Sequence, residues 1–304
     1  MSADGMPGPS PRLNVLRQTL RFTAKQDGCL PDWLGSAWRG AFGRQLKSLV
    51  CITGLPGCEP CGLYRQCAYP RIFETPPDPT RGKMRKYTDV PRPYVLLPFG
   101  GGEVRAGESL PLEIRLFGRE IQRRELVVEA LRRAAEHGLG RTLLPLQLEA
   151  MDPPLRQTLG LESAGLHDNS TELELEFIRP LRLRVQGRSV GPEDLNFGDF
   201  FSALLRRISM ICTFHEEPFE VDFRSLVGVA RALEWSRREL TWAPLKRYSQ
   251  RQQRGIDLSG LLGKVALPAD TVRPLLKYLE IGQHTLVGRG AVMGLGEYRI
   301  VPPI

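Results

Sequence analysis

Apolar and polar residues follow two different periods in the first half of the chain. Residues 13–22 alternate apolar and polar side chains, as a half-buried strand does. Residues 33–50 repeat apolar side chains every three or four positions, which predicts an amphipathic helix with Asp32 as its N-cap. Further patterns predict a strand at 110–116, a helix at 119–136 and a strand at 143–148. Residues 1–150 thus hold the ingredients of a β-α-β-β-α-β unit.

The second half repeats this order of elements. Strands are expected at 173–177, 181–185, 238–242 and 262–266, with helices at 199–212, 223–233 and 269–280. The last segment, 284–301, is expected to begin with His284 on a strand. Residues 151–170 are polar and contain proline, which predicts a linker before a second domain at 171–304. Residues 51–94 show no clear period and are rich in cysteine, proline and basic side chains, which indicates a long insertion in the first domain.

Composition narrows the class of protein. A chain of 304 residues accommodates two domains, and 41% hydrophobic with 25% charged residues is typical of a folded protein. The net charge of +8 makes a polyanionic partner plausible. We find no run of roughly 20 apolar residues that could cross a membrane, and no secretory signal at the start. We therefore expect a cytoplasmic, reducing location with no membrane partner.

Cysteines cluster in the expected insertion. Cys51, Cys58, Cys61 and Cys67 have a spacing that resembles zinc knuckles and ribbons. Four thiolates favour a structural zinc ion, with an iron–sulfur cluster as the lesser possibility and reduced, unliganded thiols as the alternative. Cys29 and Cys212 stand apart and are expected to be plain buried side chains.

Glycines gather near the end of the chain. Gly288, Gly290, Gly294 and Gly296 let a backbone approach a phosphate closely, and Arg289 adds a charge within the same loop. A tight turn before an edge strand explains the same pattern, so both interpretations stay open.

Basic residues form two further segments. Residues 242–255 interleave basic side chains with Tyr248 and amides, a mixture that grips the backbone and bases of single-stranded RNA. Its cations are Lys246, Arg247, Arg251 and Arg254. Residues 81–86, with Lys83, Arg85 and Lys86, would serve as an arm on RNA or DNA. A solvated basic loop is the alternative for each segment.

Three blocks, at residues 197–211, 246–252 and 288–298, resemble the C-terminal domain of CRISPR pre-crRNA-processing endoribonucleases of the RAMP superfamily. Residues 34–43, the four cysteines and residues 131–141 are similar to the first half of these enzymes. The resemblance implies an α+β fold of two tandem ferredoxin-like (RRM-like, βαββαβ) domains, with the Cys-rich insertion in the first and the glycine-rich loop packed where RNA lies. It implies CRISPR repeat RNA as the partner, and possible association with other CRISPR effector subunits.

The resemblance also implies a metal-independent reaction, in which the 2′-hydroxyl attacks the adjacent phosphate and leaves a cyclic phosphate and a 5′-hydroxyl. Relatives carry a histidine just before the glycine loop, where this chain has Leu286. His284 lies two residues earlier and is our leading candidate for the general base.

The helix after the first strand, where relatives keep another active histidine, offers only cations such as Arg39 and Arg44 for RNA binding. A second possibility is therefore that Tyr248 orients the hydroxyl while Arg247 and Arg251 stabilise the phosphorane. Neither His137, His167 nor His215 has a catalytic pattern.

Two other functions remain open at this point. The chain could be a non-catalytic subunit that binds or caps crRNA in an effector complex. It could instead be a zinc-ribbon DNA-binding or transcription-associated protein, although that hypothesis does not account for the three C-terminal blocks.

Overall fold

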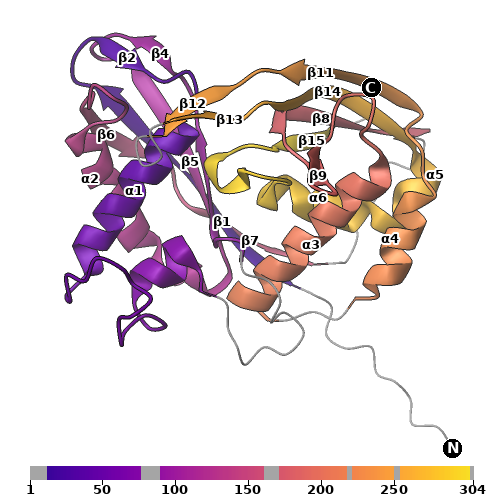
Figure 1. The fold of residues 1–304 in the computed structure, drawn as a ribbon, viewed down its shortest axis with the longest axis horizontal. Helices are drawn as coiled ribbons and strands as arrows, with labels where there is room; N and C mark the ends of the chain where they lie inside the picture. Colours follow the sequence, from indigo (N-terminus) through magenta and orange to yellow (C-terminus); the bar gives the residue numbers. More distant parts are fainter. Residues whose placement is uncertain (1–11, 77–89, 161–170, 218–220, 250–253, 302–304) are drawn as a thin grey trace, which may run out of the picture.

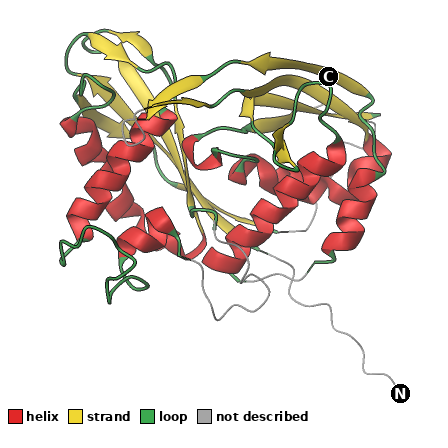
Figure 2. Cartoon of the chain, in the orientation of Figure 1, coloured by secondary structure: helices red, strands yellow, loops and turns green. Residues whose placement is uncertain are grey.

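Two antiparallel sheets, each covered by helices, form two lobes in a computed structural model of the chain (Figure 1). The structure describes residues 12–76, 90–160, 171–217, 221–249 and 254–301. Figure 2 shows that helices and strands make up most of both lobes.

The first lobe is built on β1, whose long alternating sequence lies at the centre of its sheet. The strand order is β3-β5-β1-β6, and β7 also pairs with β1. The bounds are β1 Leu13–Ala24, β3 Tyr94–Pro98, β5 Ser109–Phe117, β6 Leu146–Met151 and β7 Leu155–Leu159, with a small ribbon of β2 Gly28–Leu30 and β4 Gly102–Val104. Its helices are α1 Gly35–Val50, α2 Arg124–His137, the π-helix η1 Pro70–Glu74 and the 3-10 helix η3 Gly118–Arg123.

The second lobe has the strand order β11-β14-β8-β15. Its strands are β8 Glu172–Leu181, β11 Arg237–Ala243, β14 Gly260–Pro268 and β15 Tyr298–Val301, with the short pairs β9 Arg184–Val185 with β10 Arg188–Ser189 and β12 Lys246–Ser249 with β13 Arg254–Asp257. Its helices are α3 Phe197–His215, α4 Phe223–Arg231, α5 Ala269–Val272, η4 Arg273–Leu275, α6 Leu276–Thr285 and η5 Ala291–Met293.

Both sheets share one topology. In each lobe the first core strand lies between the fourth and the third, and the second core strand forms an edge. A helix follows the first and the third core strand. This order fits the two ferredoxin-like units expected from the sequence.

The two cores meet between the lobes. Leu16, Trp38 and Phe42 are buried in the first core, where Phe22 and Trp38 place their rings 4.7 Å apart. Val15 and Phe117 belong to the first sheet but pack into the core of the second lobe. Because apolar side chains cross the boundary, the lobes are held together by burial as well as by polar contacts.

Several elements differ from the sequence expectations. Helix α1 begins after Leu34, and no side chain caps it, so Asp32 is not its N-cap. Strand β6 begins at Leu146 because Leu143 has a φ of 52°, which a strand does not allow. A single strand, β8, replaces the first two strands expected in the second half.

The connections also differ. The segment 151–170, expected to be a linker, contains β7, which pairs with β1 from Leu13 to Arg17; residues 161–170 lie outside the described part. Strands β3 and β4 lie between residues 94 and 104, where no strand was expected. His284 belongs to α6 and not to a strand, because the helix continues to Thr285 and ends at Leu286, whose φ is 61°.

Candidate nucleic-acid interface

The hairpin of β12 and β13 brings the basic segment of the second lobe to the first lobe. Arg247 pairs with Ile256 in the hairpin, and its Nη1 atom donates a hydrogen bond to Oγ of Ser36 over 3.4 Å. Ser36 lies in the first turn of α1, whose start has no capping side chain. Figure 1 shows the hairpin beside this end of α1. A guanidinium from one lobe therefore lies at the positive end of a helix in the other.

Five arginines from separate parts of the chain are linked by charge repulsion through Arg182 and Arg247, and we call them the arginine cluster: Arg39, Arg182, Arg184, Arg247 and Arg289. Burial lowers the pKa of Arg247, and the charge of Arg39 lowers it further. Burial also lowers the pKa of Arg182; Asp257 opposes this shift, while Arg289, Arg184 and Arg247 add to it. Cations that repel one another in this way favour an anionic ligand.

Backbone oxygens hold Arg182 in place. Its Nη2 atom donates to the carbonyl oxygen of Asp257 over 2.6 Å, and its Nε atom donates to that of Ser259 over 3.1 Å. Carbonyl oxygens orient the guanidinium without neutralising it. The carboxylate of Asp257 offsets part of the charge of Arg182, and the rest remains for a ligand.

Other residues predicted to bind RNA lie on β12, β13 and α1. Lys246 and Arg44 are exposed, in β12 and on α1. Tyr248 and Arg254 belong by their backbones to β12 and β13. The predictions for Lys83, Arg85, Lys86 and Arg251 concern positions outside the described residues.

The glycine-rich loop is packed between the lobes. Gly288, Gly290, Gly294 and Gly296 have φ angles from 71° to 86°, the left-handed region that favours glycine. A Cβ atom on Gly288 would lie 2.5 Å from the carbonyl oxygen of Arg182, and one on Gly294 would lie 2.8 Å from that of Leu96 in β3. The loop thus fixes the backbone next to Arg182, and it does so immediately before the edge strand β15.

His284 belongs to α6 and contacts the sheet of the first lobe through Arg115 of β5. Burial, followed by the charges of Arg115 and Arg17, lowers the pKa of His284 to about 4. The carbonyl oxygen of His284 accepts a hydrogen bond from Nη1 of Arg115 over 3.2 Å. The imidazole is therefore neutral at pH 7, but its neighbours are residues of β1 and β5.

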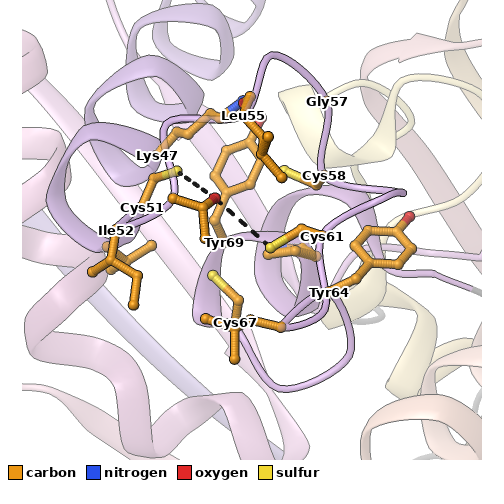
Figure 3. Close-up of a pocket in the computed structure, with 14 residues that line it drawn as sticks. Lys47, Cys51, Ile52, Leu55, Gly57, Cys58, Cys61, Tyr64, Cys67 and Tyr69 are labelled. Carbon is orange, nitrogen blue, oxygen red and sulfur yellow. Dashed lines mark hydrogen bonds between the residues drawn. The ribbon is translucent and has the colours of Figure 1, made fainter.

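The four predicted cysteine ligands line one small cavity of about 30 Å³. Figure 3 shows the sulfur atoms of Cys51, Cys58, Cys61 and Cys67 facing the same space. The Oγ1 atom of Thr53 lies 3.9 Å from Sγ of Cys51 and 3.7 Å from Sγ of Cys61. Four converging thiols suit zinc as a donor set. In the described part of the chain, however, no three or more His, Cys, Asp or Glu side chains lie close enough to hold a metal ion as placed.

The two isolated cysteines differ from each other. Cys212 is buried, as expected, and burial raises its pKa to about 12. Cys29 is exposed, so the expectation of a buried side chain was wrong there. Its short strand β2 pairs only with β4, which leaves it outside the main sheet.

Two stacked aromatic rings between two cations connect the cysteine segment to the arginine cluster. Arg39 lies over the ring of Phe73 at 4.7 Å, the rings of Phe73 and Tyr69 stack at 5.4 Å, and Lys47 lies 5.9 Å from the ring of Tyr69. The ammonium group of Lys47 donates to the carbonyl oxygens of Leu55 and Pro56. The position of Arg39 in the arginine cluster therefore depends on contacts with the segment that follows the cysteines.

Two members of the cluster, Arg182 and Arg184, were missed by the sequence analysis. The sequence from Arg179 to Arg184 places three arginines within a few residues at the end of β8, which is a usable signal. No helix among the described residues is long and apolar enough to span a membrane.

Comparison with known proteins adds two family matches. Residues 13–168 match the family model AF_1859_N, described as an N-terminal domain, and residues 175–298 match the model of the CRISPR-associated endoribonuclease Cas6. An uncharacterized protein of Archaeoglobus fulgidus is 31% identical over 115 residues, which cover 37% of this chain and 38% of that relative. The match thus spans well under half of the relative's length.

Solved structures agree on the fold. Thermus thermophilus Cas6 (TTHB231) in a product complex has a TM-score of 0.59 at 15% identity, covering 96% of this chain and all of that one. A Cas6-related protein from Pyrococcus furiosus has a TM-score of 0.52 at 12% identity, covering 94% of this chain and 98% of that one. At such identities the likeness concerns the fold alone. The two family matches together span both lobes, and residues 175–298 carry a domain of the Cas6 family of CRISPR-associated endoribonucleases.

Proposed function

We propose that this protein binds CRISPR repeat RNA between its two lobes and cleaves the precursor into mature crRNA without a catalytic metal ion. The observation that carries the proposal is the arginine cluster, which draws cations from both lobes to the uncapped start of α1. Arginine forks match phosphate oxygens in pairs, and a helix start adds backbone N–H groups that favour an anion.

The reaction proposed is attack of the 2′-hydroxyl on the neighbouring phosphorus. A bond forms between O2′ and phosphorus while the bond to the 5′-oxygen breaks, which leaves a 2′,3′-cyclic phosphate and a 5′-hydroxyl. The hydroxyl proton goes to a base, and the leaving oxygen gains a proton. Negative charge builds up on the phosphorane, and Arg247 with Arg39 would stabilise it there.

The site favours the arginine-driven form of this mechanism over His284 as the base. Burial, together with the charges of Arg115 and Arg17, lowers the pKa of His284 to about 4, which makes it a weak proton acceptor at neutral pH. Arg247 lies within 3.4 Å of Ser36 and inside the arginine cluster. Tyr248 follows Arg247 in β12, where it would orient the hydroxyl.

One observation favours a second function. This chain has Leu286 where relatives carry the histidine before the glycine loop, and burial lowers the pKa of His284 to about 4, so the usual acid–base pair is incomplete. A chain that grips RNA without cutting it would serve as a crRNA-binding or capping subunit of an effector complex. Binding without cleavage would distinguish this function.

We also propose that Cys51, Cys58, Cys61 and Cys67 hold a structural zinc ion. Their sulfur atoms converge on one cavity, and the segment around them has few apolar contacts of its own. Zinc held there would brace the loop from which Lys47, Tyr69 and Phe73 reach Arg39. An iron–sulfur cluster remains the second possibility for this donor set.

The organisation of the protein completes the proposal. We assign residues 1–150 and 171–304 to two domains with 151–170 between them, where β7 adds to the sheet of the first domain; the family matches at 13–168 and 175–298 support a division near residue 170. A reducing, cytoplasmic location suits free thiols and an RNA substrate, and other CRISPR effector subunits are possible partners.

The experiment that tests the function uses purified protein, EDTA and two repeat RNAs that differ by one 2′-deoxynucleotide at the mapped cut. We expect cleavage of the all-ribose RNA and none of the other. Tight binding without cleavage of either RNA would favour the capping subunit. No binding of either would contradict both functions.

A further inference from the structure

Phe99 presents a half-exposed aromatic ring on a turn that is held rigidly. Its side chain is 49% exposed, although its backbone N–H donates to the carbonyl oxygen of Pro111 over 2.9 Å. The turn continues through Gly101, whose φ is 139°, and a Cβ atom on Gly101 would lie 2.7 Å from the carbonyl oxygen of Pro31, which excludes a side chain. The backbone that carries the ring is therefore held in place before any ligand binds.

A buried guanidinium supports this ring from behind. Arg179 is 8% exposed and lies 4.8 Å from the centroid of Phe99, with the ring of Trp33 at 5.4 Å. Its Nε atom pairs with Oε2 of Glu297 over 2.9 Å, which fixes the guanidinium plane. Among the described residues, its Nη1 atom has no hydrogen-bond partner. The cation thus directs its charge to the rings, and one side of Phe99 is left to solvent.

The ring lies close to the arginine cluster. Arg179 precedes Arg182 by three residues at the end of β8, and its Nη1 atom lies 3.2 Å from the place where a Cβ on Gly294 would be. Trp33 lies two residues before the start of α1, whose Ser36 contacts Arg247. An RNA strand bound by the arginine cluster would therefore lie beside Phe99.

From these contacts we propose that Phe99 is a stacking platform for one unpaired base of the RNA held by the arginine cluster. The proposal rests on the proposed function and adds a base-binding position to it. Every base has a π-face, so the platform would add affinity without reading a base edge. A protein partner would need a wider apolar surface than a single ring.

The test measures binding of single-stranded repeat RNA by fluorescence anisotropy for wild type, Phe99→Ala and Phe99→Trp. Loss of one base stack is worth about 1–3 kcal/mol, so Phe99→Ala should weaken binding roughly 5- to 150-fold. Phe99→Trp should bind as the wild type does. The matched control is Phe223→Ala, which removes another exposed phenylalanine, 37% exposed, on α4.

A series of RNAs, each with one abasic nucleotide, locates the base. One abasic position should weaken the wild type as much as Phe99→Ala does, and should cause no further loss in that variant. Unchanged binding by Phe99→Ala, or a loss that adds to every abasic position, would overturn the platform while wild-type binding still supports the proposed function. A wild type that binds no repeat RNA would overturn the proposed function first, and this inference with it.

Discussion

Arg115 of β5 donates a hydrogen bond from Nη2 to Oε1 of Glu297 over 3.0 Å, and this pair joins the first lobe to the residue just before β15. The two side chains are 5% and 15% exposed. Glu297 also accepts from Arg179, and Arg115 also pairs with Glu113 at 2.6 Å. A buried network of this kind fixes how the glycine-rich loop sits against the first sheet.

Glu297→Ala should therefore destabilise the protein strongly. The variant leaves Arg115 and Arg179 buried without their shared carboxylate, which costs about 3–5 kcal/mol. Urea unfolding followed by circular dichroism measures the loss. Glu217→Ala is the control, because its pair with Arg119 is 80% and 53% exposed and should cost less than about 1 kcal/mol. Equal stability of the two variants would mean that the network does not hold the lobes together.

The environment of His284 predicts a specific dependence of stability on pH. Its pKa is about 4 in the folded protein against 6.5 for a free imidazole, so protonation favours the unfolded chain. The stability is complete above pH 6.5 and falls by about 3 kcal/mol as the pH drops to 4. His284→Asn removes this loss, so the free energy of unfolding of the variant should rise relative to that of the wild type as the pH falls from 7 to 4. His137→Asn, at the exposed end of α2, should follow the wild type.

Cleavage rates of variants distinguish the arginine-driven mechanism from one with a histidine base. Arg247→Ala should slow single-turnover cleavage by roughly 100-fold, the cost of removing one group that stabilises the transition state. The cleavage rate of Arg247→Lys should lie between those of the wild type and Arg247→Ala, because an ammonium group keeps the charge but lacks the planar fork of a guanidinium. Arg224→Ala, an exposed arginine on α4, is the control. If His284→Asn abolishes cleavage while Arg247→Ala cuts normally, the histidine mechanism is correct.

The sequence predicted the regular core elements better than the site. β1 and α3 were placed almost to their ends because each buries one face at a constant period. The hairpin of β12 and β13 was not predicted, since its strands are short and contain no alternation of apolar and polar residues. Arg39, Arg247 and Arg289 were recognised as single cations, but their meeting with Arg182 depends on the packing of two lobes. Local periodicity carries no information on that packing.

Metal content tests the cysteine site directly. Protein purified without chelators should contain about one zinc per chain, and Cys61→Ser should reduce this content and lower the melting temperature. Cys29→Ser is the matched control, since Cys29 is exposed and lies outside the cavity. Absence of both zinc and iron from the wild type would support reduced, unliganded thiols instead.

A comparison of alanine substitutions at Gly288 and Gly107 distinguishes backbone strain from a role in RNA binding. Their φ angles are 84° and 83°, so an alanine at either position costs about 1–2 kcal/mol in strain. A Cβ on Gly107 meets no atom within 4 Å, whereas one on Gly288 lies 2.5 Å from the carbonyl oxygen of Arg182, which accepts from the N–H of Arg289 over 2.8 Å. Gly288→Ala should thus displace two members of the arginine cluster.

We expect both glycine variants to lose stability and Gly288→Ala alone to lose RNA affinity, by roughly tenfold for about 1.4 kcal/mol of lost binding. Anisotropy with repeat RNA, on protein shown by circular dichroism to be folded, makes the comparison. If Gly288→Ala binds RNA as tightly as Gly107→Ala, the glycine-rich loop is a tight turn before β15 and nothing more. If it binds more weakly, the loop positions the cations that hold the phosphate, because the two substitutions impose the same strain and differ only in the contact with Arg182.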